Sequence, residues 1–138
     1  MSRLIQHTPI WRHALPDSAA ALAMAPDGKS LAVATLAGEV ELVDLATGKL
    51  GPSGARHRGG ALAVAWSPNG TLATAGQDGR VCLLGTGPDA GPVSVGACPY
   101  GAPLIGLAAT PTLAAVATSD ASLLVFNLAS AEQGETAA

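Results

Sequence analysis

A histidine, a threonine and an aspartate are the residues of this chain whose types could carry out nucleophilic chemistry. His57, Thr74 and Asp78 supply the imidazole, the hydroxyl and the carboxylate that such a site uses. A hydroxyl nucleophile also needs a turn such as G-x-S-x-G to expose it, and Thr74 stands inside the apolar segment TLATAG without one. Without that context, we predict a structural role for these three residues rather than a catalytic one.

Other motifs that could bind a cofactor or a metal are incomplete. Residues 85–90 (GTGPDA) have the outline G-x-G-x-x-A of a dinucleotide-binding turn, but GPVSVGACP follows where a helix is required. The three histidines and two cysteines show no metal-ligand spacing. Glu39 and Glu41 share a strand face, and the alternation EVELV predicts that both face solvent, opposite Val40 and Leu42. The sequence predicts no cofactor and no metal.

Composition limits the class of partner. The chain has 138 residues, the length of one ordinary domain, and a formal net charge of −3. All lysines and arginines lie at or before Arg80, and no clustered basic face is visible, which argues against nucleic-acid binding. The N-terminal sequence lacks an uninterrupted apolar signal, so we predict a cytoplasmic protein with reduced cysteines. Four prolines interrupt the uncharged stretch Ala90–Ser119, which argues against a membrane span.

The chain repeats itself with a period of 41 to 43 residues. MAPDGKSLAVATLAGEVELVDLATG (Met24–Gly48) aligns with WSPNGTLATAGQDGRVCLLGTG (Trp66–Gly87), and a degraded third copy follows at Ala109–Ala129. Asp78 of the second copy recurs as Asp120 in the third. Periods of this length indicate stacked supersecondary units, and about 40–45 residues is the length of a four-stranded propeller blade.

Each copy has the pattern of β-strands. Leu62, Val64 and Trp66 alternate with alanines, and TLATAG can pair with RVCLL across the tight turn QDG. DSAAALAMA (Asp17–Ala25) favours a helix by propensity alone, but its aligned partner GALAVAW has the strand pattern. We therefore predict a strand there, and an all-β fold of about three four-stranded antiparallel blades.

The second copy resembles the WD40-repeat family. HRGGALAVAWSPNGTLATAGQDGRVCLL has the family's histidine, then a bulky apolar residue, Ser-Pro-Asn-Gly, a strand and Asp-Gly. The resemblance covers about residues 15–130, and we predict a WD40-like domain over residues 1–130. The resemblance places the repeats at about 15–50, 57–97 and 100–130. Residues 131–138 are small and polar without a strand pattern, which predicts a flexible tail.

The resemblance also implies roles for single residues. His57, Thr74 and Asp78 would form the hydrogen-bond network that ties the strands of a WD40 blade together. That network would be one member short, because Leu84 stands where the family has tryptophan. The family's histidine is replaced by Tyr100 in the third copy and by Leu15 in the first.

The function implied by the resemblance is a non-enzymatic protein–protein interaction scaffold. Its partner face would be formed by the loops before the innermost strands and by the middle hairpin turns. These loops carry arginine, histidine, glutamine and tyrosine side chains, namely Arg12, His13, Arg56, Arg58, Gln77 and Tyr100. A ligand-binding or enzymatic propeller is the alternative, although the innermost strands contain no titratable residue. A truncated remnant of a longer propeller is a further alternative.

Three blades do not close a ring, since propellers contain roughly 4–8. RLIQHTPIW (residues 3–11) is placed to be a blade-closing outer strand. Two chains that exchange this strand would form a six-bladed homodimer with two-fold symmetry. The competing explanation is that the remaining blades belong to a different or longer chain.

Overall fold

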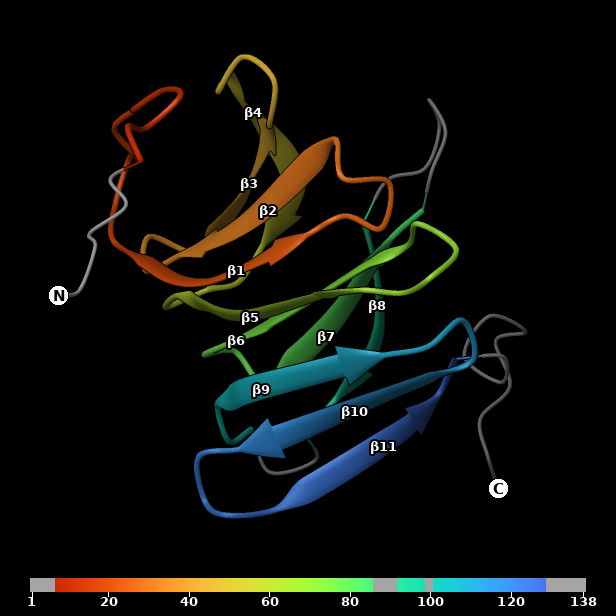
Figure 1. Cartoon of the computed structure of the whole chain (residues 1–138). Helices are drawn as coiled ribbons and strands as arrows, with labels where there is room; N and C mark the ends of the chain where they lie inside the picture. Colours follow the sequence, from red (N-terminus) through yellow and green to blue (C-terminus); the bar gives the residue numbers. More distant parts are fainter. Residues whose placement is uncertain (1–6, 86–91, 99–100, 129–138) are drawn as a thin grey trace, which may run out of the picture.

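Three small antiparallel sheets stack along the molecule in a computed structural model, which describes residues 7–85, 92–98 and 101–128 (Figure 1). Blade 1 consists of β1 (Ala19–Met24), β2 (Ser30–Thr35), β3 (Glu39–Asp44) and β4 (Leu50–Arg56). Blade 2 consists of β5 (Ala61–Trp66), β6 (Leu72–Gly76), β7 (Arg80–Leu84) and β8 (Pro92–Ala97). Blade 3 consists of β9 (Leu104–Ala109), β10 (Leu113–Thr118) and β11 (Leu123–Asn127). Each sheet is a meander in chain order.

The predicted all-β fold of propeller blades is confirmed, with one difference in strand number. Blade 3 has three strands among the described residues where four were predicted. Residues 19–24 form the strand β1, so tertiary pairing with β2 overrides the local preference of the alanines for helix. Residues 7–11 form no strand, and residues 3–6 and 131–138 lie outside the described residues.

The same pairing register recurs in all three blades. Met24 lies opposite Leu31 in blade 1, and Trp66 lies opposite Leu72 in blade 2. The second hairpin turn requires a left-handed residue in each blade, which is Gly38 (φ 106°), Gly79 (φ 72°) and, in the eroded third copy, Ala121 (φ 69°). The third blade has therefore kept the backbone conformation after losing the glycine that favours it.

Backbone hydrogen bonds that continue the pairing of the third and fourth strands within a blade correct the alignment of the third copy. The amide of His57 donates to the Gly38 carbonyl at 2.7 Å, and the amide of Cys98 donates to the Gly79 carbonyl at 2.7 Å. Cys98, not Tyr100, thus occupies the position of His57, and the loop that follows it is two residues longer. Tyr100 itself lies outside the described residues.

Each blade has two different faces, because side chains alternate along every strand. Towards the next blade it presents a small-residue face, with two alanines on each of the first two strands and two aliphatic residues on the third. In blade 1 this face consists of Ala21, Ala23, Ala32, Ala34, Val40 and Leu42, and in blade 2 of Ala63, Ala65, Ala73, Ala75, Val81 and Leu83.

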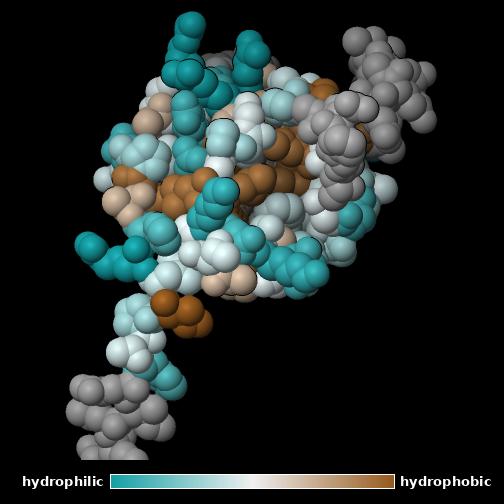
Figure 2. Space-filling view, turned by 90° about the horizontal axis from the view of Figure 1, so that it is seen from above, coloured by the Kyte–Doolittle hydropathy of each residue, from teal (hydrophilic) through white to brown (hydrophobic). Residues whose placement is uncertain are grey.

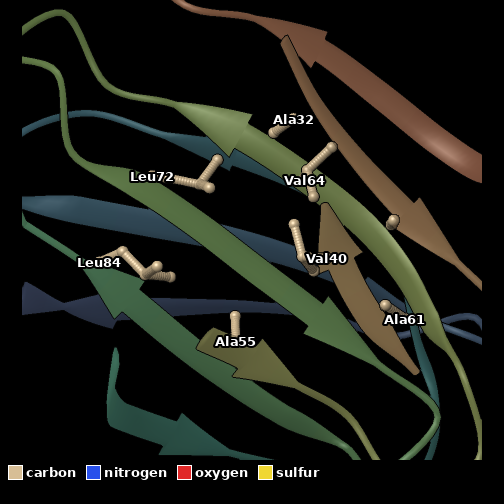
Figure 3. Packing of buried hydrophobic residues seen from close by; sticks show 8 residues of the cluster. Ala32, Val40, Ala55, Ala61, Val64, Leu72 and Leu84 are labelled. Atoms are coloured by element: carbon tan, nitrogen blue, oxygen red, sulfur yellow. The ribbon is translucent and has the colours of Figure 1, made fainter. Parts of the chain in front are cut away.

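Towards the preceding blade it presents a large-residue face. In blade 2 this face carries Val64, Leu72 and Leu84, which pack with the small-residue face of blade 1 into one core (Figure 3). Trp66, on the same face, packs against this core. A second core lies between blades 2 and 3, with Leu104, Val116 and Phe126 on the blade 3 side. The alanine-rich composition is thus explained, since alanines let successive sheets approach closely.

Trp66 adds a polar tie to this packing. Its side chain is half-buried at the junction of blades 1 and 2, and its Nε1–H donates to the Ala23 carbonyl at 2.9 Å. The indole therefore serves the contact between blades with both its apolar ring and its single donor.

Candidate functional site

His57, Thr74 and Asp78 meet at the junction between blades 1 and 2. His57 follows β4, Thr74 is central in β6, and Asp78 lies in the β6–β7 turn. His57 Nδ1 lies 2.9 Å from Asp78 Oδ1, and His57 Nε2 lies 2.8 Å from Thr74 Oγ1. The imidazole and the threonine side chain are fully buried.

The direction of these hydrogen bonds follows from the chemistry of the groups. A carboxylate can only accept, so His57 Nδ1–H donates to Asp78. In the neutral imidazole, Nε2 then accepts from the Thr74 hydroxyl. Asp78 Oδ1 also accepts from the Arg80 amide at 3.1 Å. Throughout the described part of the chain, every buried side-chain nitrogen and oxygen has a partner.

This connectivity is that of a hydroxyl–imidazole–carboxylate triad, but its position differs from that of a catalytic one. The Thr74 hydroxyl points into the packed space between two sheets, where neither water nor a substrate can reach it. A nucleophile must be open to the group it attacks. The arrangement therefore suits a network that ties β4, β6 and the β6–β7 turn together.

A groove of about 850 Å³ opens beside this network, between the edges of blades 1 and 2. It is lined by Ala37, Arg56, His57, Arg58, Gly59, Asp78, Arg80 and Cys82. We call this the arginine groove, because three exposed guanidinium groups border it and Asp78 is the only carboxylate in its lining. Within residues 7–85, 92–98 and 101–128, none of these arginines forms an ion pair, and Asp78 is engaged with His57.

Cys82, which is half-buried, also lines the arginine groove. Burial raises the pKa of its thiol, the nearby Asp78 carboxylate raises it further, and Arg80 partly opposes both. The thiol therefore stays protonated at neutral pH and is a poor nucleophile or metal ligand. Cys82 and Cys98 are both free cysteines.

The structure brings together part of the partner face predicted from the sequence. Arg56 and Arg58 border the arginine groove, and Gln77 packs over Gly59, where a β-carbon would lie 2.9 Å from Gln77 Cγ. Arg80 completes the cationic border, and sequence reasoning missed it. The available signal was its position directly after the Asp-Gly turn, two residues before Cys82 on the same strand face.

The N-terminal members of the predicted face lie elsewhere. Trp11 Nε1–H donates to the Leu45 carbonyl at 2.8 Å, and the His13 ring packs beside Trp11 and Gly48. Leu45 and Gly48 belong to the β3–β4 turn, at the opposite end of the strands from the arginine groove. Arg12, between Trp11 and His13, is exposed there.

Glu41 is buried, which differs from the prediction made from the sequence. It was expected to face solvent with Glu39, but only 7 % of it is exposed, whereas Glu39 is exposed. Its cross-strand neighbours, Val33 on one side and Pro52 on the other, enclose it. Burial raises the pKa of the Glu41 carboxyl, and the charge of Glu39 raises it further.

No group of three or more histidine, cysteine, aspartate or glutamate side chains in the described residues is arranged to hold a metal ion. No helix in the described part of the chain is long and apolar enough to cross a membrane.

Comparison with known proteins shows a likeness in structure only. No model of a known protein family matches the chain, and no curated protein sequence matches it significantly. Among solved structures, it is similar to the β-propeller domain of Cps50 (Swd1) from Myceliophteria thermophila, with a TM-score of 0.69 and 21 % sequence identity. The match covers 86 % of this chain and 38 % of that domain. The chain therefore has the fold of consecutive β-propeller blades and spans well under half the length of the propeller it resembles.

Proposed function

We propose that this chain is a WD40-repeat protein-interaction scaffold without enzymatic activity, and that it holds an acidic segment of a partner protein in the arginine groove. The observation that carries the proposal is the set of three arginines, Arg56, Arg58 and Arg80, which border one concave surface and form no ion pair with any described residue. Guanidinium groups bind carboxylates through paired hydrogen bonds, and arginine is enriched among the residues that dominate interface energetics.

The buried network supports this function by fixing the groove. His57 forms part of the floor, and its bonds to Thr74 and Asp78 join three separate segments around it. A preorganised surface loses less conformational freedom when it binds, so more of the interaction energy appears as affinity. In this proposal His57, Thr74 and Asp78 are structural, and the protein acts in the cytoplasm, which agrees with its two free thiols.

The proposal is tested with a short fluorescein-labelled polyglutamate peptide and the full chain. We expect the fluorescence anisotropy to report saturable binding that weakens as salt concentration rises. Arg58→Gln and Arg80→Gln should each weaken binding about tenfold or more, because a hydrogen bond to a charged group contributes roughly 1.5–3 kcal/mol.

Arg12→Gln is the matched control, since Arg12 is an exposed arginine at the far end of the strands. It should bind the peptide as the unaltered chain does. Equal losses for Arg12→Gln and Arg58→Gln would indicate nonspecific charge attraction and would refute the groove as the binding site. A polyserine peptide that binds as tightly as polyglutamate would refute the acidic character of the partner.

A further inference from the structure

The small-residue face is kept in blade 3, with a glycine in place of one alanine, although other features of the third copy are eroded. The register places two small residues on β9, two alanines on β10 and two aliphatic residues on β11, as in blades 1 and 2. These are Gly106, Ala108, Ala115, Ala117, Leu123 and Val125. Leu123 corresponds by register to Val40 in blade 1 and to Val81 in blade 2.

The burial of these equivalent residues differs sharply. Val40 and Val81 are 1 % and 0 % exposed, because the large-residue face of the next blade covers each of them. Leu123 is 72 % exposed, and Val125 beside it on the same face is also largely exposed. The small-residue faces of blades 1 and 2 are therefore each covered by the next blade, whereas the equivalent face of blade 3 is exposed.

At the opposite end of the stack, large apolar side chains on the outer face of blade 1 are exposed. Among the described residues, no blade lies in front of the large-residue face of blade 1, on which Leu22 is 64 % exposed and Met24 is similarly exposed. By register the same face also carries Val33, Glu41 and Val43, which are buried. Leu22 and Met24 correspond by register to Val64 and Trp66, which pack against blade 1. Figure 2, which looks down on the blade 1 end, shows a band of hydrophobic surface across this face.

From this complementarity we propose that the small-residue face of blade 3 receives the large-residue face of blade 1 from a second copy of the chain. Blade 2 separates the two end faces within one chain, so they cannot cover each other (Figure 1). Two copies arranged about a two-fold axis make the contact twice and leave neither kind of face exposed, which closes a ring of six blades. This contact is independent of the arginine groove.

The contact continues an interface that already exists twice in the chain. It therefore requires no exchanged strand from residues 3–11, and residues 7–11 form none. Figure 3 shows the side chains of Val40 and Val64 lying together between blades 1 and 2. By register, Leu123 and Leu22 of two different copies would meet in the same way.

The test is sedimentation of the full chain over a range of concentrations. We expect a species of twice the 13.5 kDa chain mass, with no larger oligomers. Leu123→Lys and Leu22→Glu should each weaken dimerisation a hundredfold or more, because each buries an unpaired charge in an apolar contact. Circular dichroism melts verify folding, which both variants should retain since both positions are exposed within one chain.

An equimolar mixture of the two variants distinguishes this contact from other modes of association. In the mixed dimer, Lys at position 123 of one copy faces Glu at position 22 of the other, and the second contact is unaltered, so the dimer should re-form. Leu36→Lys, at an exposed leucine in the β2–β3 turn outside both faces, should dimerise normally. A monomer at all concentrations, open-ended oligomers, or a dimer indifferent to both end-face variants would each overturn the proposal.

Discussion

Removing the hydroxyl of Thr74 is the most direct measure of what the buried network contributes. Thr74→Val preserves the shape of the side chain and leaves His57 Nε2 without its partner at 2.8 Å. Because the imidazole is fully buried, water cannot replace the lost bond, and the cost should be about 1–3 kcal/mol. His57→Ala should cost about 3–5 kcal/mol, because it leaves a cavity and orphans the Thr74 hydroxyl. The loss of the His57 bond to Asp78 should cost less, because the Asp78 carboxylate still accepts from the Arg80 amide.

The double variant separates the hydrogen bond from packing. In His57→Ala/Thr74→Val neither partner remains unpaired, so its loss of stability should be smaller than the sum of the single losses by about 1–3 kcal/mol. Urea unfolding followed by circular dichroism gives all three values. Thr74→Ser keeps the hydroxyl and should retain the coupling, and Thr112→Val at an exposed position should change stability little. Additive losses in the double variant would refute the network.

Three further predictions concern single positions. Ala121→Gly should stabilise the protein by up to about 1 kcal/mol, because it relieves a left-handed alanine at φ 69°, and a melting temperature that falls would contradict this. Gly38→Ala should destabilise by more than 1 kcal/mol, since a β-carbon at φ 106° would also strike the His57 carbonyl oxygen; unchanged urea unfolding would disprove the close approach. Glu41→Gln should stabilise the protein at neutral pH and progressively less as pH falls towards and below the ordinary glutamate value of 4.5. The raised pKa of Glu41 means that the folded chain binds this proton more tightly, so the unaltered protein gains stability on protonation; a pH-independent difference in urea midpoints would contradict it.

The repeat made most of the fold predictable. Alternation within each copy located the strands, and the aligned second copy corrected the helical preference of the alanines in β1. The position of Cys98 could not be found in this way, because the loop after it is two residues longer than the loop after His57. An alignment without the backbone hydrogen bonds has no reason to place the gap there.

The site was predictable where one sequence repeat carries its residues and not where several repeats contribute. His57, Thr74 and Asp78 belong to one repeat, and the WD40 resemblance predicted the contacts of His57 with Thr74 and Asp78. Arg12 and His13 were grouped with Arg56 by loop type, but the anchoring of Trp11 on the β3–β4 turn takes them to the other end of the strands. Glu41 was misplaced because alternation identifies the two faces of a strand without telling whether neighbouring strands enclose a residue.

The unequal faces of each blade also bear on how the number of units in such a chain can change. Blades 1 and 2 offer the next blade the same alanine-rich surface, so the apolar packing at the two junctions is of one type, although the His57 network belongs to the first junction alone among the described residues. Tandem duplication of a blade-length segment would add apolar packing of this existing type. Deletion of a whole unit would likewise rejoin matching surfaces. The number of blades can therefore change in single genetic steps. Replacement of an interface alanine by a larger residue, in contrast, would require a matching reduction in side-chain size on the facing blade.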